Sequence, residues 1–135
     1  MKAIADTGFI VAFKNRTDEH HHWALDVARQ IEAPALTCEA VLSEAAFHLR
    51  SSEAVLTLVD IGLLKVGFHA GENIDKLHDF ATRYSDRKPD LADLCLIRMS
   101  ELYPRHILIT VDEEDFRVYR RNKREAIPLL RPPRK

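Results

Sequence analysis

The sequence predicts an α/β fold, arranged as a three-layer α/β/α sandwich with a short, mostly parallel central sheet. Short apolar runs of strand length alternate along the 135 residues with longer amphipathic segments of helical period. Such alternation places helices on both faces of a parallel sheet. The length fits a single domain, 1–135, and a hydrophobic content of 46% favours a packed core over a disordered chain.

Local signals predict the elements of the first half. The apolar run around Ile4 ends abruptly at Asp6-Thr7-Gly8, as a short buried strand does at the edge of a sheet. Asp and Thr are residues that cap helices, so Thr17-Asp18 and Thr37 are expected at helix starts. The expected order is a strand around Ile4, a helix over 9–13, a helix from Thr17-Asp18, a strand over 34–37, a helix capped by Thr37, and a helix over 52–63.

The second half continues the alternation. The segment 106–111 is continuously apolar and rich in β-branched residues, and it predicts the clearest strand of the chain. Pro89 suits the first turn of a helix that continues to Leu102. The expected order is a strand over 65–68, an amphipathic helix over 73–84, the Pro89 helix, the strand over 106–111 and a last short strand over 126–130.

The near-zero net charge of −1 conceals a basic C-terminal tail that begins at about residue 117. This tail contains eight basic residues against one acid, Glu125, which leaves 12 of the 20 basic and 20 of the 21 acidic side chains to the rest of the chain. Such a tail indicates either a phosphate-bearing or acidic partner near the C-terminus, or a solvated helix face followed by a frayed end. Arg120 and Arg121, together with Arg87 before the Pro89 helix, are candidate contacts to such a partner, and ordinary solvation is the alternative.

The chain has no feature of an exported or membrane-bound protein. Asp6 interrupts any apolar leader at the start, and no stretch approaches the roughly 20 apolar residues that span a bilayer. Cys38 and Cys95 are isolated thiols without the spacing of a disulfide framework or a CxxC motif. We expect a cytoplasmic protein in which both thiols are buried as small apolar side chains.

Four carboxylates stand where an ordinary solvated surface would not place them. Asp6 and Asp112 follow two apolar strands, and Glu44 and Asp93 lie within largely apolar helical segments. Asp90, three residues before Asp93, shares its helix face. Any one of these acids is more often structural than functional, but their joint occurrence changes the odds.

Carboxylates gathered without basic partners repel one another, and a hard divalent cation is the usual compensation. We therefore expect Asp6, Glu44, Asp93 and Asp112 to bind Mg²⁺ or Mn²⁺ and to act in catalysis. A metal in such a site orients a water molecule and neutralises charge on a phosphodiester. Thr7 and Thr110, each beside a strand-end aspartate, are expected to hydrogen-bond to the carboxylates.

Four stretches in this order resemble the PIN-domain nucleases, and within them the VapC-type toxins of toxin–antitoxin pairs. They are Ala5-Asp6-Thr7-Gly8-Phe9-Ile10, Leu42-Ser43-Glu44-Ala45, Asp90-Leu91-Ala92-Asp93-Leu94-Cys95-Leu96 and Ile109-Thr110-Val111-Asp112-Glu113-Glu114-Asp115-Phe116. The resemblance implies a PIN-like fold in which Asp6, Glu44, Asp93 and Asp112 form a metal-binding pocket and Asp115 is an accessory acid. Leu94 departs from the alanine that commonly follows the third acid, which adds bulk but removes no ligand.

The resemblance also implies RNA cleavage by metal-activated water, a homodimer, and inhibition by a small antitoxin. Two alternatives remain: a PIN-type nuclease that serves RNA processing, and a catalytically silent binding module of the same fold. An aspartic protease is excluded, since its Asp-Thr-Gly needs an all-β fold. A phosphoacceptor receiver domain is excluded because the first strand offers one acid, and Pro128 stands where a lysine is required.

Overall fold

A five-stranded sheet organises the protein, which is described by a computed structural model over residues 1–134. The strand order is β3-β2-β1-β4-β7, and every neighbouring pair is parallel. In the register of the central strands, Ile4 pairs with Leu36 on one side and with Leu108 on the other. The strands are β1 (Ala3–Ala5), β2 (Ala35–Thr37), β3 (Leu64–Val66), β4 (Ile107–Ile109) and β7 (Leu129–Leu130).

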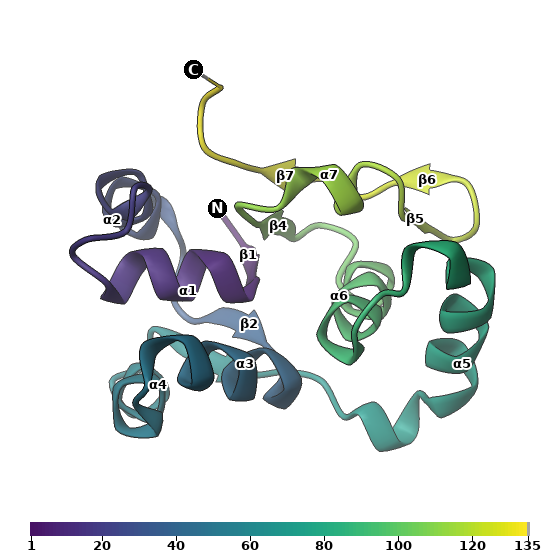
Figure 1. The fold of residues 1–135 in the computed structure, drawn as a ribbon, viewed down its shortest axis with the longest axis horizontal. Coiled ribbons are helices and arrows are strands. Elements are labelled where there is room, and N and C mark those ends of the chain that lie inside the picture. The colour runs from purple at the N-terminus through teal and green to yellow at the C-terminus, as the bar shows by residue number, and fades with distance from the viewer. Residues whose placement is uncertain (135) are drawn as a thin grey trace.

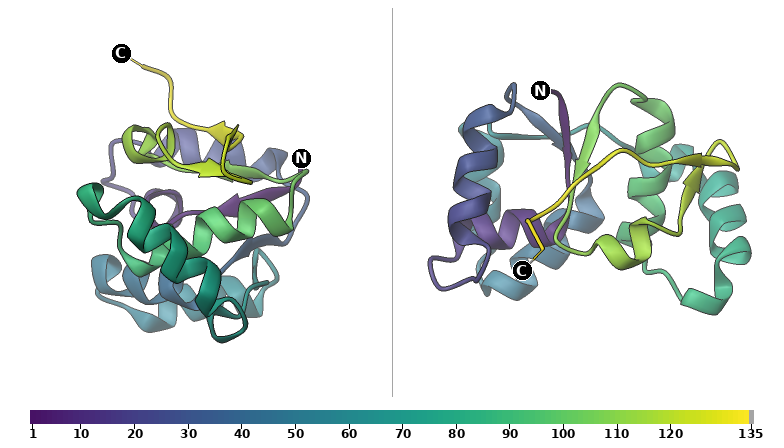
Figure 2. Two further views of the ribbon diagram at one scale, coloured as in Figure 1. Left: turned by 90° about the vertical axis from the view of Figure 1, so that its right-hand side faces the viewer. Right: turned by 90° about the horizontal axis from the view of Figure 1, so that it is seen from above.

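Helices cover both faces of this sheet, which confirms the predicted three layers. Figure 1 shows α1 (Thr7–Lys14), α2 (His21–Gln30), α3 (Glu39–Leu49) and α4 (Ser52–Asp60) on one side. On the other side lie α5 (Ile74–Arg83) and α6 (Leu91–Leu102), and the view from above in Figure 2 shows the same division. The remaining elements are the single turns η1 (Ala70–Glu72) and η2 (Ser85–Arg87), the short helix α7 (Glu113–Phe116), and an antiparallel hairpin of β5 (Arg120–Arg121) with β6 (Glu125–Ala126).

The strand order explains where a site can form. The chain steps outward from β1 to β2 to β3 and then returns across the sheet through α5 and α6 to β4, on the other side of β1. Connections between parallel strands keep one hand, so this reversal puts the later helices on the opposite face. The carboxyl ends of β1 and β4 therefore flank the point where the direction changes, the place where ligands bind in open α/β sheets.

The core lies between the sheet and the two helix layers. Ile4 and Leu108 in the central strands and Leu96, Ile97 and Met99 in α6 are all fully buried. Both cysteines are free and buried, as expected. Among residues 1–134, no helix is long and apolar enough to cross a membrane.

Three helix starts differ from the sequence prediction because polar side chains cap turns elsewhere. The helix expected from Thr17-Asp18 begins at His21, since Asn15 accepts a hydrogen bond from the backbone of Thr17 and Asp18 accepts one from that of His20. Such side-chain bonds compete with helix formation. The cap of α3 is Cys38 rather than Thr37, and the N-cap of α6 is Asp90, so that Pro89 precedes the helix. The Thr37 hydroxyl instead donates to the carbonyl of Ala5 and joins β2 to β1.

The C-terminal segment also departs from the prediction. The strand expected over 126–130 is split, because Glu125–Ala126 pairs with Arg120–Arg121 in the hairpin and only Leu129–Leu130 joins the sheet beside β4. The basic residues from Arg117 to Arg124 thus lie on a turn and a hairpin, not on a solvated helix face. The turn of the hairpin has positive φ angles at Asn122 and Lys123.

Candidate active site

The four predicted carboxylates line one cavity at the carboxyl edge of the sheet. Its volume is about 560 Å³, and Asp6, Glu44, Asp93 and Asp112 reach it from four different elements. Asp6 follows β1, Glu44 lies in α3, Asp93 is in the first turn of α6, and Asp112 precedes α7. The tertiary fold therefore brings together four acids that lie far apart in the sequence. The cavity is also lined by Thr7, Gly8, Val11, Asp18, His48, Arg87, Lys88, Asp90, Val111 and Asp115.

Asp6 is the most enclosed of the four acids, with 6% of its surface exposed. It is the N-cap of α1, and its Oδ1 accepts a hydrogen bond of 2.6 Å from the backbone N–H of Thr7. Its Oδ2 accepts a second bond of 2.6 Å from the Thr110 hydroxyl. Burial raises the pKa of Asp6 to about 6, and the two hydrogen bonds and the neighbouring carboxylates modify this value in opposite directions.

Thr110 couples the ends of the two central strands. Its Oγ1 donates to Asp6 and accepts a bond of 2.9 Å from the backbone N–H of Asp112. One hydroxyl therefore sets the positions of two of the acids, as expected for Thr110. The hydroxyl of Thr7 differs from the expectation: the contact to Asp6 is made by its backbone, and its Oγ1 is buried without a hydrogen-bond partner among residues 1–134.

Asp93 carries the largest electrostatic perturbation of the four. Burial is the first cause, and the charges of Asp90, Asp6, Asp112 and Asp115 add to it, so that the pKa of Asp93 rises to about 8. Asp90 is held beside Asp93 because it caps α6: its Oδ1 accepts a hydrogen bond of 2.8 Å from the backbone N–H of Asp93. The protein thus holds a proton on Asp93 at neutral pH when no cation balances the cluster.

The other acids follow the same trend with less burial. The pKa of Glu44 is raised by burial and then by the charge of Asp90, and that of Asp112 is raised by burial and then by the charge of Asp115. Asp115 is bound by Arg87 at 2.9 Å, which ties η2 to α7 at the rim. All the acids named from the sequence face one cavity. The pKa values of Asp6, Glu44, Asp93 and Asp112 are raised, first by burial and then by neighbouring carboxylate charges.

Tyr119 is a residue that the sequence patterns did not reveal. Its side chain is fully buried, and it packs edge-on against Phe116 and Tyr84 with ring centroids 5.4 and 5.0 Å apart. Its hydroxyl donates to Oδ2 of Asp93 over 3.4 Å. His48 was also missed, although its position four residues after Glu44 places it on the same helix face.

Replacing Tyr119 by phenylalanine is expected to lower catalytic turnover about threefold to tenfold, since the hydroxyl orients Asp93. A hydrogen bond to the charged form of an acid favours that form, so its loss should raise the pKa of Asp93. The acid limb of the pH–rate profile should then move to higher pH. A profile that keeps its shape would mean that Tyr119 acts through packing alone. Tyr103→Phe provides the control, because the Tyr103 hydroxyl donates to the carbonyl of Gly67 and does not line the cavity.

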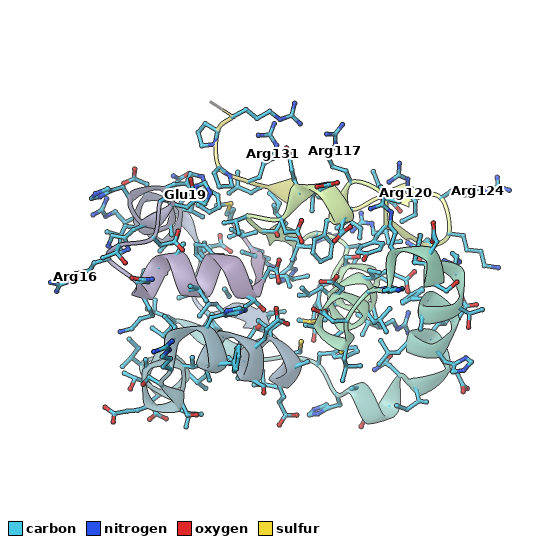
Figure 3. The ribbon with its side chains drawn as sticks, in the orientation of Figure 1. Arg16, Glu19, Arg117, Arg120, Arg124 and Arg131 are labelled. Carbon is cyan, nitrogen blue, oxygen red and sulfur yellow. The ribbon has the colours of Figure 1, made fainter. Side chains whose placement is uncertain are left out.

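The predicted basic contacts are placed less uniformly. Arg120 is half-buried, and its guanidinium donates to the carbonyls of Arg117, Val118 and Tyr119. Arg121 requires a correction: it is 6% exposed and holds the carbonyls of Ser100 and Pro104 and the carboxylate of Glu125. Its position between the end of α6 and the hairpin gives no surface contact. Figure 3 shows Arg124 pointing away from the body, while Arg117 and Arg131 lie along the upper edge.

The donor chemistry of the cavity fits a hard divalent cation. All the acids supply carboxylate oxygens, and the buried Thr7 hydroxyl lacks a partner that a metal-bound water would provide. Within residues 1–134, no three His, Cys, Asp or Glu side chains are close enough to hold an ion directly. A cation here would therefore keep waters between itself and some of the carboxylates, as Mg²⁺ commonly does.

The fold and the position of the cavity define an α/β protein with an acidic site at the reversal of its strand order. Among solved structures, the fold of this chain is similar to that of VapC20 of Mycobacterium tuberculosis, a toxin that cleaves the sarcin–ricin loop. The two chains superpose with a TM-score of 0.68. The match covers 79% of this chain and 87% of that one, at 15% sequence identity. The chain therefore has a PIN-like α/β fold. No protein-family model and no curated protein matches the sequence.

Proposed function

We propose that this protein is a divalent-metal-dependent endoribonuclease, and that it is the cytoplasmic toxin of a type II toxin–antitoxin pair. One observation carries the proposal: Asp6, Glu44, Asp93 and Asp112 line a single cavity at the carboxyl edge of a VapC-type PIN fold. The similar fold of a toxin that cleaves RNA supports RNA as the substrate. A cluster of carboxylates with raised pKa values at such an edge has little structural use of its own.

The four acids would hold Mg²⁺ or Mn²⁺, partly through water. The cation would supply charge neutralisation at the phosphodiester and a water of lowered pKa. Asp6 is the most rigid anchor, because hydrogen bonds from Thr7 and Thr110 fix both its oxygens. Asp93 is suited to help hold the cation and, in its deprotonated form, to accept a proton from the attacking water. Hydrolysis then joins the water oxygen to phosphorus and breaks one ester P–O bond.

The proposal includes a small antitoxin and a second copy of the chain as protein partners. Apolar side chains remain exposed on two helices of one layer, namely Phe47 on α3 and Leu56 on α4, with Ile61 directly after α4. Phe47 is 78% exposed, so a partner that covered it would bury apolar surface. A partner surface on these helices is consistent with both expectations.

The test is inducible expression in a bacterial host, with wild type beside Asp6→Asn. We expect the wild type to arrest growth and to create discrete new RNA 5′ ends, and both effects to disappear in Asp6→Asn. Asp60→Asn is the matched control, since Asp60 is exposed at the end of α4, away from the cavity. It should behave as wild type.

Arrest that persists in Asp6→Asn would show that toxicity does not arise from the acidic site. Soluble wild-type protein that causes neither arrest nor new ends would contradict the toxin assignment. The purified protein would then be assayed for RNA cleavage with Mn²⁺, which separates a processing nuclease from a silent binding module.

A further inference from the structure

The acidic cavity carries a negative charge that would repel an RNA strand, and the four proposed metal ligands contribute to that charge. Seven acidic side chains line it, and they repel the phosphates of any RNA strand that approaches. Within residues 1–134, Arg87 and Lys88 are the only Lys or Arg side chains that line it. A bound cation acts at the scissile phosphate, but the flanking phosphates need positive charge from the protein. The acids are Asp6, Asp18, Glu44, Asp90, Asp93, Asp112 and Asp115.

Arg87 is already used within the protein. Its Nη1 lies 2.9 Å from Oδ1 of Asp115, and both side chains are about one-third exposed, at 33% and 34%. The pair links η2 to α7 and occupies part of the hydrogen-bonding capacity of the guanidinium. A phosphate would have to displace Asp115 to gain a full contact.

Lys88 is not held by such an ion pair. Its side chain is exposed, and no hydrogen bond or ion pair of its ammonium group occurs within residues 1–134. The ammonium is a point charge on a flexible stem, which suits a phosphate that arrives with some freedom of position. Lys88 is thus the free cation at the rim of the cavity.

The backbone holds Lys88 at this rim in an unusual conformation. Lys88 ends η2 in the left-handed region, with φ 49° and ψ 54°, and its N–H donates to the carbonyl of Ser85 at 3.3 Å. The left-handed region is strained for a residue other than glycine, because the Cβ approaches the following carbonyl oxygen. Pro89 follows, and then Asp90 caps α6, so the direction in which the lysine side chain leaves the backbone is set by structure on both sides.

We propose that Lys88 binds a backbone phosphate of the RNA strand next to the scissile one, and so directs the strand across the acidic cavity. This inference rests on the proposed ribonuclease function. It names the side of the cavity on which the strand lies, along η2 and the start of α6. Lys88 contributes to substrate affinity and not to bond cleavage.

The test compares Lys88→Gln with Lys123→Gln. Lys123 is the matched control because it is also an exposed lysine at positive φ, 70°, but it lies at the turn of the hairpin and does not line the cavity. The substrate is a synthetic single-stranded RNA that carries the cleavage site mapped in the expression experiment. The measured quantities are kcat and KM over a series of salt concentrations.

We expect Lys88→Gln to raise KM about tenfold and to leave kcat within about threefold, with Lys123→Gln unchanged. The loss of one phosphate contact should reduce the slope of log kcat/KM against log salt by about 0.7, the value for one contact to a single strand. Lys88→Arg should restore most of the affinity, because it restores the charge.

Unchanged KM and salt slope in Lys88→Gln, with active wild type, would overturn the assignment of Lys88 alone. A drop in kcat without a change in KM would do the same, since it indicates a role other than strand binding. Wild-type protein that does not cleave RNA would overturn the proposed function together with this inference. Equal melting temperatures of the two glutamine variants would exclude misfolding as the cause.

Discussion

Asp93→Asn is expected to abolish RNA cleavage, by about a thousandfold or more, while stabilising the metal-free protein at pH 8 to 9. The loss of activity follows because the substitution removes the carboxylate that would bind the cation and accept a proton, and a neutral amide performs neither role well. The gain in stability follows from relieving repulsion in the cavity. A variant that is inactive but more stable would separate function from folding at this position.

The sign of the stability change follows from the pKa of Asp93. In the folded protein this pKa is raised from 3.8 to about 8, so the unfolded chain loses the proton first. The carboxyl therefore lowers the free energy of unfolding progressively as pH rises from about 4 to about 8. Allowing for partial exposure of the group, we expect Asp93→Asn to gain roughly 2 kcal/mol at pH 8 to 9.

The measurement is chemical denaturation of wild type, Asp93→Asn and the control Asp60→Asn, in EDTA, from pH 4 to pH 9. The advantage of Asp93→Asn should shrink toward pH 4, where the carboxyl is protonated in both states. A destabilised Asp93→Asn at pH 8 would mean that Asp93 is paired with a cation of the protein. Normal cleavage by this variant would remove Asp93 from the catalytic set.

Removal of divalent metal is expected to have the second large effect. EDTA should eliminate cleavage, and Mg²⁺ or Mn²⁺ should restore it. At pH 7, Asp93 holds its proton in the metal-free protein, whereas a metal ligand must be deprotonated. Binding should therefore release close to one proton per protein at pH 7, and the apparent affinity should rise with pH until about pH 8.

Titration calorimetry with Mn²⁺ in two buffers of different ionisation enthalpy measures this proton release directly. Asp6→Asn should bind Mn²⁺ at least about tenfold more weakly, since Asp6 is the acid whose two oxygens are already oriented. Full activity in EDTA would contradict a metal mechanism. Mn²⁺ binding without proton uptake or release would show that the ion avoids Asp93.

Much of the architecture was predictable because local patterns and strand connectivity agree. The apolar runs around Ile4 and Leu108 are central strands, and the amphipathic segment 73–84 contains α5. Parallel strands end at one edge of a sheet, so acids after two such strands had to lie near each other. The positions of Asp6 and Asp112 at strand ends therefore predicted that they lie close together. Glu44 and Asp93 were candidates because each is an acid in a largely apolar helical segment, and the motif resemblance implied one pocket for all four.

Other features depended on contacts between distant segments. Arg121 looks like a surface cation in the sequence, but it is buried because the end of α6 offers two carbonyls and Glu125 offers a carboxylate. The run over 126–130 divides because its start pairs with β5 in the hairpin, while Leu129–Leu130 pairs with β4. Neither outcome has a signal in the local sequence.

The same distinction separates the candidate ligands from the residues that support them. The acids can be identified from short motifs, because an acidic residue directly after an apolar strand or within an apolar helical segment is a local feature of the sequence. Which hydroxyl orients them is not, because Thr110 reaches Asp6 across 104 positions and Tyr119 reaches Asp93 across 26. Likewise, because Arg87 pairs with Asp115, Lys88 is the free cation of the rim among residues 1–134. Hydrogen bonds and charges act over a few ångströms, and folding alone decides which groups come that close.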